Sequence, residues 1–190
     1  EGVLARLKAI RVCDPACGSG AYLVGMMHEL LRLREALFVA RVRDHATTHD
    51  RKLEIVQRNL YGADLSQPAL ETAMLRLWLS LVVDDLRDPV ADPNVDVSLP
   101  NLKFKFAQGD TVVGYVDSGD AGKVGREQYA DLAERLRILH DEYFAPARDD
   151  SRPRPEIEAD ITAQEHSLRD LLGTTEIPGS VSWNTRFAEV

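Results

Sequence analysis

The sequence predicts an α/β fold in which a parallel sheet is flanked by helices. In the first half of the chain, short apolar segments alternate with longer segments of helical periodicity, which is typical of βαβ units around a parallel sheet. A glycine-rich turn over residues 14–20 joins the first strand to the first long helix. The 190 residues are enough for one domain with a sizeable apolar core. We therefore expect a doubly wound sheet built from successive strand–helix pairs.

The expected elements follow one another along the first half of the chain. A strand over residues 6–13 precedes the glycine-rich turn, and helices are expected over 21–41 and 48–59. A short, buried strand over 60–63 ends at Asp64. Ser66 is expected to cap the next helix, over 69–83, which is apolar nearly all round and should be buried on most sides. A loop over 84–100 should then lead to a strand over 102–108.

The chain changes character after Asp117. A connector rich in Gly and Asp is followed by two helical patterns, over 126–144 and 157–172, with a proline-rich charged turn between them. This pattern predicts a helical hairpin inserted into the α/β domain. We expect an α/β domain over 1–117, the hairpin over 118–180 and a closing segment over 181–190. The mixed charges of the hairpin favour a spacer over a surface that contacts DNA or another domain.

Composition limits the partners and the location of the protein. The formal net charge is −8 with no basic run, so a surface that grips phosphates would have to come from elsewhere in a longer protein. No apolar run approaches the ~20 residues of a membrane span, and no signal-peptide pattern is visible. Cys13 and Cys17 are too few for a disulfide framework and wrongly spaced for zinc. We interpret both as small buried residues of a cytoplasmic protein.

The strongest chemical signal is the turn DPACGSG at residues 14–20. It follows a strand and opens a helix, and its two glycines allow the backbone to approach a bound group closely. Open α/β sheets bind ligands beyond the carboxyl ends of their strands. The lysine of a triphosphate-binding loop is missing, which disfavours a nucleoside triphosphate. The alternative is a tight turn that needs glycine for its geometry alone.

Two further acids end later strands. Asp64 follows the second strand, where a carboxylate can accept hydrogen bonds from both ribose hydroxyls of a nucleoside cofactor. Asp110 follows the third strand, where a carboxylate can accept a hydrogen bond from an exocyclic amine such as adenine N6. Either acid could instead be a plain turn residue. With Asp14, the three acids are expected to lie along one edge of the sheet.

Three segments resemble N6-adenine DNA methyltransferases, especially those of fused restriction-modification and phage-defence proteins. Residues 14–23 (DPACGSGAYL) resemble motif I, residues 60–81 the segment with motif II, and residues 101–111 (NLKFKFAQGDT) the segment with motif III. Order and rough spacing agree over residues 1–115, and motif I is the specific one. The resemblance implies a Rossmann-like methyltransferase fold, S-adenosylmethionine as cofactor and DNA as substrate.

The resemblance also implies roles for individual residues. The methionine end of the cofactor would be held by the loop, and the nucleoside end by residues after the next two strands. Asp64 would bind the ribose hydroxyls, Leu65 would pack on the adenine ring and Asp110 would accept from its N6 amine. Tyr22 could line the cofactor pocket or pack under the loop. The implied cofactor residues are Asp14, Pro15, Ala16, Cys17, Gly18, Gly20, Tyr22, Asp64, Leu65 and Asp110.

The catalytic motif of that family, Asn/Asp-Pro-Pro-Tyr/Phe, does not occur in this chain. Asn184 is followed by Thr185 and does not match it. We therefore expect the chain to stop short of the motif, which leaves the fold incomplete at its carboxyl side and the chain alone inactive. Two alternatives remain: a methyltransferase for RNA or protein amides, and a non-catalytic cofactor-binding or interaction fragment. Of the other residues, His45 and His49 are expected on a solvated surface and Trp78 in the core.

Overall fold

The computed structural model describes residues 2–38, 47–83, 102–112, 126–145, 151–172 and 179–188. The chain divides into two compact units, Glu1–Gln108 and Gly109–Val190. The predicted boundary between residues 117 and 118 and the predicted loop over 84–100 lie outside the described residues. Among the described residues, none of the helices combines the length and apolarity that a membrane crossing needs.

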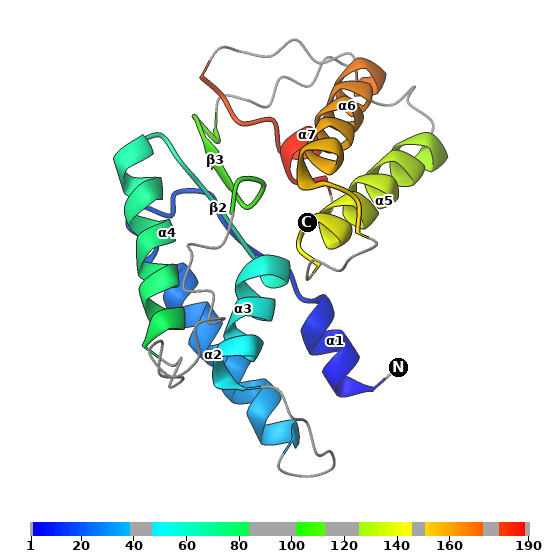
Figure 1. The fold of residues 1–190 in the computed structure, drawn as a ribbon. Helices are drawn as coiled ribbons and strands as arrows, with labels where there is room; N and C mark the ends of the chain where they lie inside the picture. The colour runs from blue at the N-terminus through cyan, green and yellow to red at the C-terminus, as the bar shows by residue number, and fades with distance from the viewer. Residues whose placement is uncertain are drawn as a thin grey trace. The chain divides into compact units, whose positions relative to one another are not determined.

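The first unit is a mixed α/β structure around a parallel sheet of three strands (Figure 1). The strands are β1 (Val12–Asp14), β2 (Leu60–Asp64) and β3 (Phe106–Gln108), in the order β1-β2-β3. Asp14 is paired with Gly62 and Asp64 with Gln108, so the carboxyl ends of all three strands point the same way. The parallel sheet predicted from the sequence is confirmed for this part of the chain.

The helices of this unit are α1 (Val3–Ala9), α2 (Ala21–Phe38), α3 (Thr48–Asn59) and α4 (Gln67–Val82). α2, α3 and α4 pack against the strands, whereas α1 contacts α2 and α3. One apolar cluster joins residues of α2, α3 and α4 to one from each strand, with Leu23, Met27 and Leu77 fully enclosed. β2 is buried along most of its length, as expected of a central strand covered on both faces.

The helix predicted over 48–59 has those same bounds, because both of its ends are well defined. Thr47 and Asp50 form a reciprocal capping box, in which each side chain accepts a hydrogen bond from the other residue's backbone N–H. Asn59 ends the helix directly before β2. The helix predicted from residue 21 also begins there, and it is described to Phe38.

Several local predictions are wrong. The strand predicted over 6–13 is replaced by α1 and the short β1, since Leu, Ala, Arg and Lys are all strong helix formers. The strand predicted over 102–108 begins only at Phe106, because residues 103–105 form a turn closed by a hydrogen bond from Lys105 N to Leu102 O of 2.9 Å. Ser66 takes the N-cap position of α4 but makes no side-chain cap bond.

The burial predicted around α4 is wrong as well. Leu70, Ala73, Leu77 and Leu81 are buried on one face, whereas Leu75 and Leu79 are 48% and 46% exposed on another. Trp78 is half-buried rather than part of the core. His49, predicted on a solvated surface, is half-buried and its Nδ1 lies 3.1 Å from the carbonyl oxygen of Leu81. His45 lies outside the described residues.

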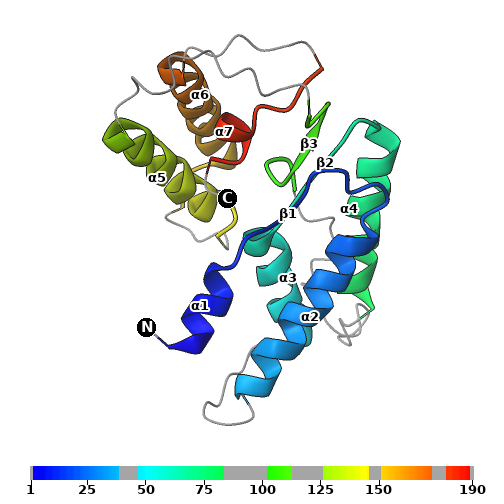
Figure 2. The same ribbon diagram turned by 180° about the vertical axis from the view of Figure 1, so that it is seen from behind.

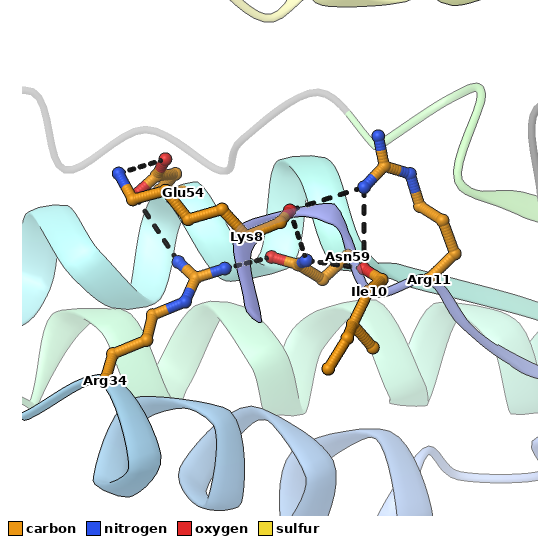
Figure 3. A network of polar contacts seen from close by, with 6 residues as sticks. All are labelled: Lys8, Ile10, Arg11, Arg34, Glu54 and Asn59. Carbon is orange, nitrogen blue, oxygen red and sulfur yellow. Dashed lines mark hydrogen bonds and ion pairs between the residues drawn. The ribbon is translucent and has the colours of Figure 1, made fainter. Parts of the chain in front are cut away.

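A network of polar contacts attaches α1 to α2 and α3 (Figure 3). The buried amide of Asn59 donates to the carbonyl oxygens of Lys8 (3.1 Å) and Ile10 (2.6 Å) and accepts from Arg34 Nη2 (2.8 Å). Arg34 also contacts Glu54 at 3.4 Å, and Lys8 pairs with Glu54 at 2.9 Å. Burial lowers the pKa of Arg34 from its usual value, and Glu54 opposes that shift. The carboxyl end of α1 is thus held by hydrogen bonds to its carbonyls.

The second unit contains α5 (Arg126–Tyr143), α6 (Arg154–Leu172) and α7 (Trp183–Arg186). α5 and α6 lie side by side in both views (Figures 1 and 2), as a hairpin requires. Leu136, Ile157, Ile161 and Leu168 are buried, and Tyr143 donates to Glu158 Oε1 at 2.9 Å. The two predicted helices are therefore present, although α6 begins at Arg154 rather than at residue 157. Whether they form an insertion or a spacer stays a prediction.

Candidate functional site

The loop between β1 and α2 is a compact turn built on its own backbone. Ala16 N donates to Asp14 Oδ1 at 3.1 Å, and Gly20 N donates to Cys17 O at 2.8 Å. Val24 N donates to Gly20 O at 3.0 Å, which begins the hydrogen-bonding pattern of α2. The chain therefore turns sharply from strand to helix within residues 14–20. This is the geometry predicted for the segment.

The two glycines of the turn are needed for different reasons. Both have positive φ, 51° at Gly18 and 78° at Gly20, a region that side chains rarely adopt. A Cβ at Gly20 would lie 2.7 Å from Ala73 Cβ and 2.9 Å from Ala73 Cα, so α4 leaves no room for one. A Cβ at Gly18 would meet nothing within 4 Å. Gly20 therefore serves the packing of the loop on α4, whereas Gly18 leaves open space beside the loop.

The carboxyl end of β2 bonds directly to this loop. Asp64 Oδ2 accepts from Gly18 N at 2.9 Å, and its Oδ1 accepts from Ser66 N at 2.8 Å. Cys17 N donates to the carbonyl oxygen of Ala63 at 2.9 Å. The structure thus brings Asp64 together with the loop that follows Asp14. Asp64 therefore acts as a turn residue, which was the alternative to a ligand-binding role, since its carboxylate accepts from two backbone N–H groups.

Asp64 retains capacity for a ligand beyond these two bonds. A carboxylate offers about four acceptor positions over its two oxygens, and one on each oxygen is in use. The side chain is half-exposed, as is that of Asp14. Each oxygen of Asp64 can therefore accept a second hydrogen bond from outside the protein. A vicinal diol is one group whose two hydroxyls could use both.

Apolar side chains stand exposed in the loop and after β2. Tyr22 is 55% exposed and Leu65 66% exposed, and Pro15 and Ala16 are exposed in the turn itself. The exposure of Tyr22 disfavours the alternative that its ring packs under the loop. The carbonyl oxygen of Leu65 accepts from Gln108 Nε2 at 3.3 Å, which connects it to the end of β3.

The two cysteines beside the loop are not activated nucleophiles. Burial raises the pKa of Cys13 to about 12 and that of Cys17 to about 11, and the neighbouring Asp14 carboxylate adds to both shifts. Both thiols are therefore protonated near neutral pH. Cys17 is buried as predicted and belongs to the apolar cluster, while Cys13, also predicted to be buried, is only half-buried. Among the described residues no group of three or more potential metal ligands gathers.

Asp110 belongs to the second unit. Its backbone forms a parallel bridge with Ser180, with Asp110 N donating to Gly179 O at 2.7 Å and Val181 N donating to Asp110 O at 2.8 Å. Its Oδ1 accepts from Val112 N at 2.8 Å, as in a turn residue, which was the alternative to a ligand-binding role. The structure therefore brings Asp14 and Asp64 to one loop and describes Asp110 in a separate unit.

Sequence reasoning missed three residues around the loop. Gly62 in β2 has no room for a Cβ, which would lie 2.8 Å from the ring of Phe106 and 3.1 Å from Cys17 Sγ. A glycine inside a strand is the available signal for such a close approach. Arg76 Nη1 donates to Ser19 Oγ at 3.0 Å. Nothing in the sequence pairs those two residues, which lie 57 positions apart.

A glycine-rich loop after the first strand and an acid further along the sheet are also features of dinucleotide-binding domains. Two comparisons with known proteins identify the class of this chain. Residues 1–100 match the family model of the MmeI DNA-methyltransferase domain. The chain is also 37% identical over 114 residues to a Methanocaldococcus jannaschii protein whose name proposes it as a type II restriction enzyme and methyltransferase. That match covers 60% of this chain and 9% of the relative, and no solved structure matches.

Because the family model covers more than half of its length, the chain belongs to the MmeI DNA-methyltransferase domain family. It is thus similar to the DNA methyltransferase part of restriction-modification enzymes, as the sequence resemblance predicted. It spans about a tenth of the length of the relative that it matches.

Proposed function

We propose that this chain supplies the S-adenosylmethionine-binding part of an enzyme that methylates adenine N6 in DNA, in restriction-modification or phage defence. One observation carries the proposal: the glycine-rich loop after β1 is bonded to the half-exposed acid that ends β2, in a chain of this family. We place the enzyme in the cytoplasm, where its DNA substrate would lie.

The residues of the first unit fit such a cofactor. The two acceptor positions that Asp64 retains match the two ribose hydroxyls. The open space beside Gly18 allows a bound group to approach the backbone, and Asp14 would bind the ammonium of the methionine end. Leu65 and Tyr22 offer exposed apolar surface for the adenine ring. The proposed role of Asp110 toward the amine of that ring rests on the sequence resemblance, because Asp110 belongs to the second unit.

The chemistry of the cofactor is the transfer of a sulfonium methyl group to a nucleophile. What this chain would contribute is binding and orientation: it would hold the methyl donor in one place, which lowers the entropic cost of the transfer. In the complete enzyme an adenine turned out of the duplex would be held by the motif Asn/Asp-Pro-Pro-Tyr/Phe. That motif is absent from these 190 residues, so we expect no methyl transfer by this chain alone.

DNA binding would rest on other parts of a longer protein. The chain has a net charge of −8, whereas proteins that bind phosphates along a duplex usually present a basic surface. A methyltransferase for RNA or protein amides would share this cofactor part. In a longer protein that contains the chain, mass spectrometry of nucleosides from methylated DNA would distinguish the substrates. N6-methyladenine supports the proposal, and methylcytosine or unmethylated DNA contradicts it.

Cofactor binding is tested by calorimetric titration of S-adenosylmethionine and S-adenosylhomocysteine into the chain, with ATP as a ligand that should not bind. In the Asp64→Asn variant we expect about five- to tenfold weaker binding, because an amide nitrogen cannot accept from a ribose hydroxyl. Glu71→Gln is the matched control, since it removes one exposed carboxylate of α4 whose hydrogen bond, among the described residues, is to Gln67. A folded wild-type chain that binds neither sulfur compound would overturn the assignment.

A further inference from the structure

Three successive residues of the loop contact the segment that runs from the end of β2 into α4. Gly18 N donates to Asp64, Ser19 Oγ accepts from Arg76, and Gly20 lies against Ala73. Ala73 and Arg76 are three residues apart, which places them on one side of a helix. α4 therefore presents one small and one cationic side chain to the turn.

The contact with Ser19 is the one side-chain hydrogen bond of Arg76 within the described part of the chain. Arg76 is exposed on α4, and it forms no ion pair with any carboxylate of the described residues. An exposed arginine normally extends into solvent, because fixing its long side chain costs rotamer entropy. Here its guanidinium instead donates to the hydroxyl of Ser19 at 3.0 Å, across 57 positions of sequence.

Ser19 lies between the two glycines whose backbone is least restricted. Glycine loses more conformational freedom on ordering than any other residue, so the turn needs contacts that select one conformation. The amide of Gly18 is fixed by Asp64, and the α-carbon of Gly20 is fixed by the close approach of Ala73. The bond to Arg76 fixes the one residue between them.

We propose that Arg76 is a positioning residue for the cofactor loop and acts through the hydroxyl of Ser19. The effect of Arg76 on cofactor binding rests on the proposed function. Its effect on the order of the loop does not, because that order can be measured without any ligand. Arg76 would hold residues 18–20 in the binding conformation before the cofactor arrives, so that binding does not have to order them. It would not touch the reacting atoms.

Two readouts on the same variants test this role. Hydrogen exchange of the chain without ligand, followed by mass spectrometry, reports the order of residues 16–22, and calorimetry reports the dissociation constant for S-adenosylmethionine. The variants are Arg76→Ala, Arg76→Lys, Ser19→Ala and the double variant Arg76→Ala/Ser19→Ala. Arg32→Ala is the matched control, since it removes an exposed arginine of α2 that bonds Glu29 and not the loop.

We expect faster exchange of the loop peptide in Arg76→Ala and Ser19→Ala, with the melting temperature unchanged. Binding should weaken about three- to tenfold in each, within the net worth of one typical hydrogen bond, and by no more in the double variant. Arg76→Lys should recover part of both losses, because an ammonium can also donate to the hydroxyl.

Unchanged exchange in Arg76→Ala would overturn the role, whether or not the chain binds the cofactor. Additive losses in the double variant would also overturn it, since Arg76 would then act independently of Ser19. If the wild-type chain binds no S-adenosylmethionine while loop exchange still responds to Arg76→Ala, the cofactor assignment fails and the positioning contact stands.

Discussion

A polar side chain lies at each end of β2: Asn59 directly precedes the strand and Asp64 is its last residue. Both side chains bond to segments that flank β1. At the amino end, Asn59 donates to two carbonyl oxygens before β1 (Figure 3). At the carboxyl end, Asp64 accepts from a backbone N–H of the loop after β1. One strand therefore fixes both ends of its neighbour, with a donor at one end and an acceptor at the other.

The two ends differ in burial and in remaining hydrogen-bonding capacity. Asn59 is fully buried with its donors and one acceptor position occupied, and its partner Arg34 is 1% exposed. Asp64 is half-exposed and has an acceptor position left on each oxygen. The amino end therefore contributes to stability alone, while the carboxyl end can serve both the fold and a ligand. Substitutions at the two ends should separate these roles.

The largest effect is expected at the buried end. Asn59→Leu would leave Arg34 and the carbonyls of Lys8 and Ile10 with only the longer contacts, of 3.4 Å, that Glu54 and Arg11 supply. The free energy of unfolding should therefore fall by about 3–5 kcal/mol. Urea denaturation measures it. The double variant Asn59→Leu/Arg34→Met should lose less than the sum of the two single variants, since both partners are then removed. An additive result would mean that the hydrogen bond between Arg34 and Asn59, drawn in Figure 3, does not couple the two residues.

A slightly smaller loss of stability is expected in the loop between β1 and α2. Gly20→Ala places a Cβ 2.7 Å from Ala73 Cβ at a positive φ. Overpacking and the left-handed backbone together should cost about 2–5 kcal/mol. Gly25→Ala is the control, because it lies in α2 with nothing within 4 Å and should stabilise the helix by about 0.5–1 kcal/mol. Thermal melting of both variants checks the contrast, which equal melting temperatures would refute.

An intermediate effect on stability, together with an effect on binding, is expected at Asp64. In Asp64→Asn the new amide nitrogen faces a backbone N–H that needs an acceptor, so unfolding should become easier by about 1–3 kcal/mol. Urea denaturation with and without S-adenosylmethionine measures both roles, since a bound ligand raises the stability of the native state. A variant that is destabilised yet still gains wild-type stabilisation from the cofactor would confine Asp64 to a structural role.

The smallest effect on stability is expected for the partly exposed ion pair of Lys8 and Glu54 in the network of Figure 3. Lys8 pairs with Glu54 at 2.9 Å, but both side chains are partly open to solvent. Lys8→Ala should lower the free energy of unfolding by less than about 1 kcal/mol, and less again at high salt. Denaturation at two salt concentrations would show it. A loss as large as that of Asn59→Leu would mean that the ion pair, rather than the amide, attaches α1.

The sequence predicted the order of elements better than their ends. β2 and α3 were recognisable because Asn59, Leu60 and Asp64 mark clear changes of periodicity. The sequence pattern of α1 predicts a strand, because seven residues are too few to distinguish the helical period of 3.6 from the strand period of 2. The exposure of Leu75 and Leu79 could not be predicted, because the sequence shows that these side chains are apolar but not which segments cover them.

Local motifs predicted the candidate site, but its connections needed three-dimensional information. The turn at Gly18 and Gly20 and the acid at Asp64 are visible in sequence. The hydrogen bond from Gly18 to Asp64 spans 46 positions, and that from Arg76 to Ser19 spans 57. Such pairs depend on the parallel register of β1 and β2, which a single sequence does not contain.

The five residues of β2 set the distance between the amide of Asn59 and the carboxylate of Asp64. Each residue of a parallel strand adds about 3.3 Å and turns the next side chain to the opposite face. Inserting or deleting one residue would move Asp64 to the wrong side of the sheet as well as out of reach of Gly18. The number of residues in β2 therefore has to suit the segment from Ile10 to Gly18, which Asn59 and Asp64 hold at its two ends.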